Sequence, residues 1–433
     1  MIRILQVRNI DSLVESRRQK TSEKDRKTVQ SILNDVRKNG DSAVKKYERK
    51  FNGRKTSQLR VSAKEIKEAR SKISRGESKA INELDFENSM YENALRTSLE
   101  EAIKKINLMP FNKEETGVYV EKSLVPISSV GCYIPGGQAR YPSSAIMSVG
   151  PARWVGVKRI VVVSPPGRDG KIDPLTIAAA KRCGATEIYK VGGAQAIGAL
   201  AYGTKSIPKV DKIVGPGGKF VSIAKSLVSD QTAIDMVAGP TELGIIADAS
   251  SDPELVALGL ISQAEHSKDT MCFVITQSKT VAKQIQKSIE KLIPGTERSS
   301  IIRESLTKNG FIAVCKNRNE MVELANKIAP EHLELMVNGT KSFSKKITGA
   351  GLLLIGKNTP SAASDYLLGT NHILPTNGFG RTRGGLSVLD FLKLQTMVES
   401  KKLGLRNISK SLKALTDAED LPNHYKAVKR RLD

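Results

Sequence analysis

The sequence of 433 residues predicts an α/β fold in which helices cover parallel sheets, with helical segments at both ends of the chain. From about residue 126 onward, short apolar runs rich in β-branched residues alternate with Ala-rich helical runs. The apolar runs do not alternate with polar residues, which indicates strands buried on both faces, as in a parallel sheet. The pattern restarts after Met236, so we expect two successive α/β units.

Residues 1 to about 125 are polar and charged, with apolar residues at the three- and four-residue spacing of amphipathic helices. In TVQSILNDVRKNGDSAVKKYERKF, Gly40 separates two such helices, and Asp41 or Ser42 can cap the second. We therefore expect this part of the chain to be mainly helical.

The first α/β unit is predicted from the apolar runs SVGCYIP, KRIVVVSPP, EIYKVGG and DKIVGPGG and the helices between them. One helix can be placed closely. Asp173 is a good N-cap and Pro174 suits the first helical position. Gly184 can take the left-handed conformation that ends a helix, so the helix should lie between these residues.

The second unit is predicted from strands near residues 243, 272, 311 and 351, in LGIIAD, CFVIT, FIAVC and GLLLI. Helical runs separate these strands, and the first of them continues through His266. About the last fifty residues return to a helical pattern.

Composition excludes several classes of protein. With 39% hydrophobic and 26% charged residues, the chain is not disordered as a whole. No apolar run approaches the ~20 residues of a membrane span, and MIRILQVRNIDSL lacks the apolar centre of a signal peptide. We expect a soluble cytoplasmic protein with no membrane partner. Its cysteines form no C-x-x-C pair and are expected as reduced core thiols: Cys132, Cys183, Cys272 and Cys315.

The net charge of +24 invites a nucleic-acid-binding function. However, the densest basic runs are short, aromatic residues are only 4%, and no helix-turn-helix or zinc-finger spacing occurs. We expect no nucleic-acid partner, with a basic nucleic-acid-binding protein kept as an alternative. Two phosphate-binding patterns are also rejected. GLLLIGKN is an apolar strand, and GPGGKF lacks the third glycine of the dinucleotide fingerprint.

Histidines carry the strongest chemical signal. Gln263 and His266 are three residues apart on a predicted helix and can share one face. Glu331 and His332 are adjacent on extended backbone after Pro330, and a carboxylate beside an imidazole suits acid–base work near neutral pH.

The other two histidines also have carboxylate neighbours. Asp365 and His372 flank a glycine turn, and Glu419 and His424 are five residues apart near the C-terminus. Imidazole, carboxylate and amide oxygen without thiolate suit Zn²⁺ or a similar divalent ion in a catalytic or substrate-binding site.

Eight segments in order along nearly the whole chain resemble the histidinol dehydrogenase family. They are GCYIPGGQARYPSSAIM, YKVGGAQAI, DMVAGPTE, SQAEHS, APEHLEL, SDYLLGTNHILPT, GLSVLDF and AEDLPNH. The resemblance implies oxidation of L-histidinol to L-histidine through histidinaldehyde, the last two steps of histidine biosynthesis. It also implies reduction of two NAD⁺ and a homodimer with one Zn²⁺ per active site.

The resemblance implies roles for individual residues. The Zn²⁺ ligands, which also bind substrate, would be Gln263, His266, Asp365 and His424. The acid–base residues would be Glu331 and His332, the latter also contacting substrate. Further substrate contacts would be Thr241 and Glu419, with His372 close by. The NAD side would include Tyr133, Gln195 and Gly218.

Two positions depart from the family pattern. Gly218 stands where the family has the Asn of GPGN that touches NAD, and Thr241 replaces the Ser of AGPSE. Both leave the catalytic groups in place. A zinc-dependent hydrolase on the same scaffold, with Glu331 activating water, is kept as a further alternative function.

The resemblance also implies a plan of two incomplete Rossmann-like domains, with the second inserted in the first. Residues 1–22 would form an N-terminal helical segment, and residues 23–128 and 240–385 the domain with the zinc and catalytic residues. Residues 129–239 would form the inserted NAD-side domain. Residues 386–433 would form a helical tail that docks on the partner subunit and shares its active site.

Overall fold

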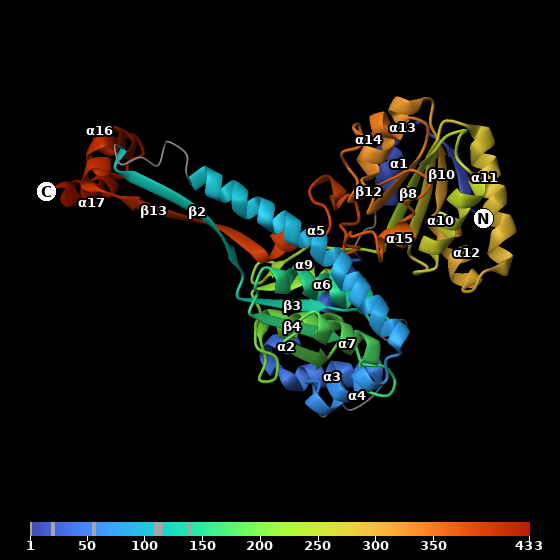
Figure 1. Cartoon of the computed structure of the whole chain (residues 1–433), viewed down its shortest axis with the longest axis horizontal. Coiled ribbons are helices and arrows are strands. Elements are labelled where there is room, and N and C mark those ends of the chain that lie inside the picture. Colours follow the sequence, from blue (N-terminus) through green and yellow to red (C-terminus); the bar gives the residue numbers. More distant parts are fainter. Residues whose placement is uncertain (1, 19–21, 54–57, 108–115, 137–139) are drawn as a thin grey trace.

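The computed structural model describes residues 2–18, 22–53, 58–107, 116–136 and 140–433. These residues form two parallel sheets covered by helices, and an antiparallel ribbon that projects from them (Figure 1). The predicted parallel α/β architecture in two units is confirmed.

One sheet has six parallel strands in the order β1-β10-β9-β8-β11-β12. Its strands are β1 (Arg3–Gln6), β8 (Glu242–Ala247), β9 (Met271–Thr276), β10 (Phe311–Val314), β11 (His332–Met336) and β12 (Leu352–Ile355). Its helices are α1 (Ile10–Arg17), α10 (Pro253–Ala264), α11 (Lys279–Leu292), α12 (Ser299–Lys308), α13 (Arg318–Ile328), α14 (Thr340–Ser344) and α15 (Ser361–Ser364). Apolar residues of α10, α11 and α12 pack on one face, and those of α1, α13 and α14 pack on the other.

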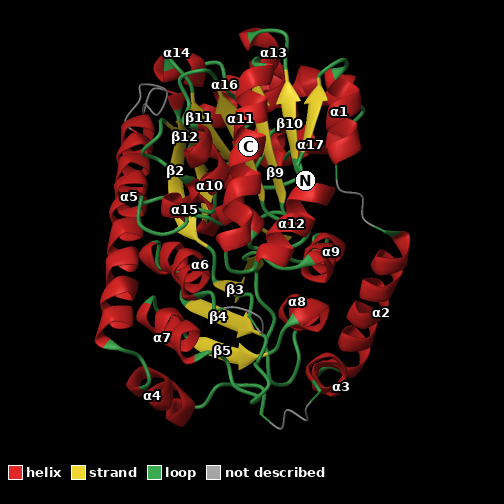
Figure 2. Ribbon diagram, turned by 90° about the vertical axis from the view of Figure 1, so that its right-hand side faces the viewer, coloured by secondary structure: helices red, strands yellow, loops and turns green. Residues whose placement is uncertain are grey.

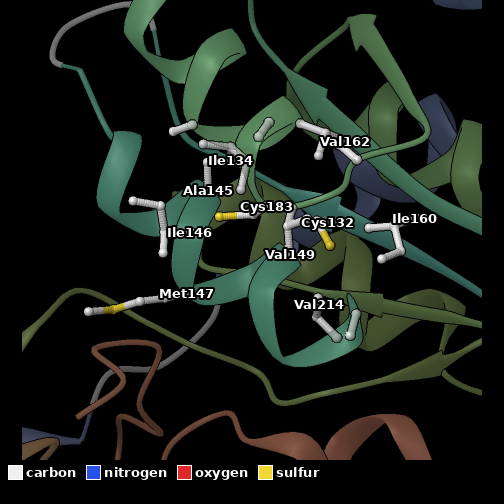
Figure 3. Close-up of a cluster of buried hydrophobic side chains, with 14 of the residues drawn as sticks. Cys132, Ile134, Ala145, Ile146, Met147, Val149, Ile160, Val162, Cys183 and Val214 are labelled. Carbon is white, nitrogen blue, oxygen red and sulfur yellow. The ribbon is translucent and has the colours of Figure 1, made fainter. Parts of the chain in front are cut away.

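The other sheet has five parallel strands in the order β5-β4-β3-β6-β7. Its strands are β3 (Ser129–Tyr133), β4 (Arg159–Ser164), β5 (Glu187–Lys190), β6 (Lys212–Val214) and β7 (Ala233–Ile234). Its own helices are α6 (Pro142–Trp154), α7 (Pro174–Arg182), α8 (Gly193–Tyr202) and α9 (Lys219–Val228). Figure 3 shows the core beneath α6, where Cys132 and Cys183 are buried as free thiols. All four cysteines are buried and free, as expected.

Four N-terminal helices also cover the five-stranded sheet, namely α2 (Glu23–Asn39), α3 (Asp41–Asn52), α4 (Ala63–Ser71) and α5 (Arg75–Asn107). Helices α2 and α3 pack with α8 and α9, while α4 and α5 pack with α7 and α6. Figure 2 shows α5 and α2 on opposite sides of this sheet. The expectation that residues 23–128 belong with residues 240–385 is therefore wrong for these helices, because their apolar faces are buried against the five-stranded sheet.

The chain start also differs from the expected helical segment. Residues 3–6 form β1, which pairs in parallel with β10 so that Arg3 lies beside Phe311. Because β1 completes the six-stranded sheet, this segment belongs to that body; only α1 is helical as predicted.

The projecting ribbon, here called the arm, pairs β2 (Val118–Pro126) antiparallel with β13 (Leu392–Ser400). Two helices, α16 (Lys402–Ala418) and α17 (Pro422–Leu432), form its far end (Figure 1). The predicted helical tail is correct for α16 and α17. It is wrong for β13, because every residue of that strand has a partner in β2.

Local capping follows the sequence at α7 but not at α3. The N-cap of α3 is Gly40, and the Asp41 side chain accepts hydrogen bonds from Ser206 instead of capping the helix. The Asp173 side chain accepts hydrogen bonds from the N–H groups of Leu175 and Thr176, and Pro174 opens α7. Gly184 has φ +101°, and Gly40, with φ +52°, separates α2 from α3. In the part of the chain that the structure describes, no helix has both the length and the apolar character needed to span a membrane.

Candidate active site between the two sheets

A cleft of about 660 Å³ separates the two bodies. On one side it is lined by Pro135, which follows β3, and by residues 216–218, which follow β6. On the other side, Thr241 precedes β8 and Glu331 precedes β11. The carboxyl edge of the five-stranded sheet therefore faces the amino edge of the six-stranded sheet. The strand order of the former reverses between β3 and β6, which is where α/β sheets bind dinucleotides.

Gln263 and His266 both line this cleft, as the three-residue spacing predicts. Helix α10 ends at Ala264, so Gln263 lies in its last turn and His266 just beyond it. The prediction that this helix continues through His266 is therefore wrong. The His266 Nδ1 atom lies 3.1 Å from the Gln263 carbonyl oxygen. This contact orients the ring and leaves Nε2 for another partner.

Glu331 and His332 enter the cleft from the start of β11. Helix α13 ends at Ile328, Ala329 takes a positive φ of 51°, and extended backbone follows, as Pro330 predicts. The Glu331 carboxylate accepts hydrogen bonds from Thr241 Oγ1 at 2.5 Å and from the Glu242 N–H at 2.8 Å. Thr241 Oγ1 also accepts a hydrogen bond from Gln263 Nε2 at 2.7 Å, so Thr241 joins the two predicted groups.

Asp365 completes the cluster. It follows the short helix α15, and its Oδ1 atom lies 3.2 Å from His332 Nε2. The predicted turn is present, with Gly369 at φ +71°. It returns His372 so that Nδ1 lies 2.9 Å from the Asp365 carbonyl oxygen.

Burial and mutual attraction shift the pKa values of this cluster. Burial by itself lowers the pKa of His332, but the charges of Glu331 and Asp365 outweigh it and raise the pKa to about 9. Burial raises the pKa of Glu331 above its ordinary value. Burial opposes ionisation of Asp365, but the close approach and charge of His332 lower its pKa. A carboxyl group with a raised pKa beside an imidazolium–carboxylate pair is suited to proton transfer.

The donor set fits a divalent metal ion. Gln263, His266 and Asp365 supply an amide, an imidazole and a carboxylate along one wall of the cleft. Asp365 Oδ1 is buried with no aligned hydrogen-bond partner among the described residues. Within the described part of one chain, however, no three His, Cys, Asp or Glu side chains gather closely enough to hold a metal. One chain thus offers an incomplete ligand set.

His424, the fourth predicted metal ligand, and Glu419, a predicted substrate contact, lie outside the cleft. Glu419 and His424 are exposed at the far end of the arm and do not line the cleft. A single chain does not bring them to Asp365, and their predicted roles require an active site shared between subunits.

The predicted cofactor residues divide into two groups. Gly218 lines the cleft at the start of α9. Tyr133 and Gln195 are 5% and 2% exposed and do not line it. Tyr133 Oη accepts a hydrogen bond from the Gly193 N–H at 3.1 Å, and Gln195 Nε2 donates to Glu48 at 2.8 Å. Their contact with NAD stays a prediction.

Two contacts of this site were not predicted from the sequence. Ser144 Oγ of α6 lies 3.0 Å from His372 Nε2 and bridges the two bodies. Glu242 accepts a hydrogen bond from the Glu331 N–H at 3.3 Å, while its own N–H donates to Glu331. Ser144 and His372 are 228 residues apart, so local spacing holds no signal for their contact. For Glu242, the sequence does hold one signal: it directly follows Thr241, which is itself predicted to contact substrate.

Comparisons with known proteins agree on one family. The family model described as histidinol dehydrogenase matches residues 15–432. A histidinol dehydrogenase of Methanococcus maripaludis is 43% identical over 94% of this chain and 93% of its own length. One of Bacillus licheniformis is 39% identical over 95% and 94%. The crystal structure of histidinol dehydrogenase from Elizabethkingia anophelis superposes with a TM-score of 0.88 at 32% identity, covering 100% of this chain and 98% of that one.

Proposed function

Because this chain belongs to the histidinol dehydrogenase family, we propose that it oxidises L-histidinol to L-histidine through histidinaldehyde and reduces two NAD⁺. The observation that carries this proposal is the convergence of Gln263, His266, Asp365, Glu331 and His332 on one cleft, opposite a dinucleotide-type sheet edge. This reaction would provide the last two steps of histidine biosynthesis.

When bound, Zn²⁺ would hold the imidazole and amino nitrogens of the substrate, and NAD⁺ would accept hydride. Gln263, His266 and Asp365 would hold the metal from this chain, with His424 of a second copy as the fourth protein ligand. Thr241 borders the same space, and its hydroxyl, already bonded to Glu331 and Gln263, would align substrate with both.

The two oxidations would make different demands on the acid–base residues. In the first, the neutral, deprotonated form of His332 would accept the alcohol proton as the carbinol carbon loses hydride, giving the aldehyde. The raised pKa of His332 makes this form a stronger base than an ordinary imidazole. In the second, Glu331 would take a proton from water while the hydroxide adds to the aldehyde carbon. The resulting anion of the aldehyde hydrate, RCH(OH)O−, would then lose a second hydride to NAD⁺ and a proton, giving the carboxylate of histidine.

The arm supports a homodimer. It carries apolar side chains that are largely exposed in one chain, including Val398 at 64% and Leu415 at 61%. The arm is too small to bury a core of its own, and such exposed apolar residues favour contact with a second subunit. We propose that the arm docks on a second copy and supplies His424 and Glu419 to its cleft.

The direct test is an assay of the purified protein with Zn²⁺, L-histidinol and NAD⁺. We expect two NADH for each histidine formed. A zinc-dependent hydrolase on this scaffold would form no NADH, and that result would overturn the proposal.

The Glu331→Gln variant should separate the two oxidations. Glutamine cannot accept the proton of water, so oxidation of supplied histidinaldehyde should fall by about 10²–10⁴-fold, while oxidation of histidinol to the aldehyde should fall far less. Single-turnover measurements from each substrate provide the comparison. Thr241→Ser, which keeps the hydroxyl bonded to Glu331, is the matched control and should retain both steps. Equal losses in both steps for Glu331→Gln would contradict the assigned role.

The Gly218→Asn variant should bind NAD⁺ more tightly. Gly218 has φ −65° and ψ 173°, which any residue can adopt, and an added Cβ would meet no atom within 4 Å. One new hydrogen bond, worth ~0.5–1.5 kcal/mol, should lower the KM for NAD⁺ by about two- to tenfold. Gly218→Ala, which adds only the Cβ, should leave the KM unchanged. An unaltered or higher KM in the Asn variant would mean that other residues already make this contact.

A further inference from the structure

The turn at residues 215–218 has little conformational freedom, and residues 216–218 of it line the proposed cofactor side of the cleft. Gly215 has φ +106°, and a Cβ there would overlap the backbone oxygen of Tyr133. A Cβ at Gly217 would overlap Val221. Steric overlap therefore excludes side chains at both glycines. It does not by itself hold the turn in one position relative to the cleft.

A buried ion pair holds both polar groups of Gly215. Its N–H donates to Asp235 Oδ2 at 2.8 Å, and its carbonyl accepts from Lys225 Nζ at 2.9 Å. Lys225 Nζ also pairs with Asp235 Oδ1, which closes a ring of three residues. The side chains of Lys225 and Asp235 are 2% and 0% exposed, so water does not compete for these bonds.

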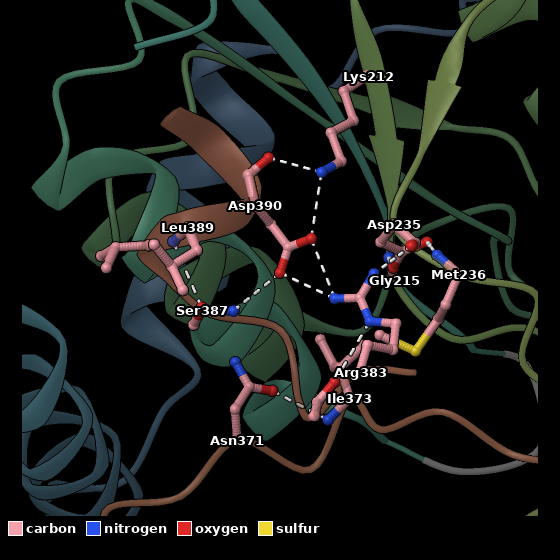
Figure 4. A network of polar contacts seen from close by, with 12 residues as sticks. Lys212, Gly215, Asp235, Met236, Asn371, Ile373, Arg383, Ser387, Leu389 and Asp390 are labelled. Atoms are coloured by element: carbon pink, nitrogen blue, oxygen red, sulfur yellow. Dashed lines mark hydrogen bonds and ion pairs between the residues drawn. The ribbon is translucent and has the colours of Figure 1, made fainter. Parts of the chain in front are cut away.

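The same ring connects to the segment between β12 and β13 (Figure 4). Arg383 Nη1 donates to the Asp235 carbonyl, and Arg383 Nη2 lies 3.0 and 2.9 Å from the carboxylate oxygens of Asp390. Lys212 of β6 donates to Asp390 as well, at 3.1 Å. The turn is thus tied both to its own sheet and to the chain segment that returns from the six-stranded body.

We propose that Lys225 and Asp235 are positioning residues for the nicotinamide dinucleotide, acting through the Gly215 backbone. This inference rests on the proposed function, in which the 215–218 turn borders the cofactor. A buried ion pair is often no more stabilising than a pair of apolar side chains of the same size. Apolar side chains, however, would leave the N–H and C=O of Gly215 without partners and free the turn to move.

The test compares cofactor binding in charge-matched variants. The double variant Lys225→Met, Asp235→Asn removes both charges and so leaves no buried charge unpaired. Its KM for NAD⁺ and its Kd for NADH should both rise by about tenfold. The KM for histidinol, and kcat at saturating NAD⁺, should stay within about twofold of the parent. Lys225→Arg retains a donor and a charge and should restore part of the affinity.

The matched control is an ion pair at the opposite edge of the same sheet. Arg159 begins β4 and lies 2.7 Å from Glu187. The double variant Arg159→Met, Glu187→Gln, which also removes both charges of its pair, should lower thermal stability without changing either cofactor constant. If the ion pair of Lys225 and Asp235 is merely structural, its double variant will behave like this control, with a smaller active fraction and unchanged KM and Kd. That result, in folded protein, would overturn the inference.

Failure of the proposed function would look different. In that case the parent protein would form no NADH from histidinol. The Kd for NADH, measured by calorimetry without turnover, would still compare parent with variants. Equal Kd values would then refute the positioning role on their own.

Discussion

A mixture of the Glu331→Gln and His424→Ala variants, unfolded and refolded together, is expected to recover about a quarter of wild-type activity. Each variant alone should be nearly inactive, because every site lacks either the proposed acid–base carboxylate or a proposed metal ligand. The expectation follows from the arm, which carries His424 away from the cleft of its own chain.

The recovery comes from hybrid dimers. Random pairing makes about half of the dimers hybrids. In a hybrid, one site combines both defects, while the other combines intact Glu331 of one chain with intact His424 of the other. Differential tags on the two variants measure the hybrid fraction directly.

The matched control mixes Glu419→Ala with His424→Ala. Both substitutions lie on the arm, so every hybrid site receives one defective arm and no activity should return. If Glu331→Gln and His424→Ala hybrids form but remain inactive, the arms serve their own subunits and the shared site is wrong.

His266→Ala is expected to lose most of its zinc, and prolonged chelation of the unaltered protein should abolish turnover. An imidazole is one of the few neutral nitrogen ligands in the proposed set, so its loss weakens metal binding strongly. Zinc per chain, measured by atomic absorption, reports this loss independently of activity.

Ser262→Ala is the control for the metal experiment. Ser262 also lines the cleft, but its hydroxyl donates to the Gly259 carbonyl within α10. This variant should keep its zinc. Added Zn²⁺ should restore the chelated enzyme, whereas undiminished turnover in a verified metal-free preparation would contradict the assignment.

The features that the sequence predicts correctly depend on interactions between residues that are close together in the chain. Asp173, Pro174 and Gly184 bound α7 because capping and chain reversal depend on residues within one or two turns. Pro330 places Glu331 and His332 on extended backbone for the same reason. Such signals are confined to a few neighbouring residues, and they also place Gln263 near His266.

Pairings between distant segments account for what was missed. From the sequence alone, β13 is predicted to belong to a helical tail. It forms a strand because β2, almost three hundred residues earlier in the chain, pairs with it. The apolar face of α2 predicts burial, but it does not say which sheet buries it. Likewise, Tyr133 and Gln195 belong to recognisable segments, yet both are buried, and Gln195 donates a hydrogen bond to Glu48 of α3, a residue distant in the sequence.

The opposed sheet edges also set the direction of the electric field in the cleft. Helices α6 and α9 begin at its cofactor side, so the partial positive charges of their N-termini face it. Helix α10 ends at the other side and presents a partial negative charge there. A pyrophosphate would be attracted to the first wall, and a metal cation or substrate ammonium to the second. The backbone dipoles alone would therefore favour the proposed anionic cofactor at one wall of the cleft and the proposed cationic groups at the other.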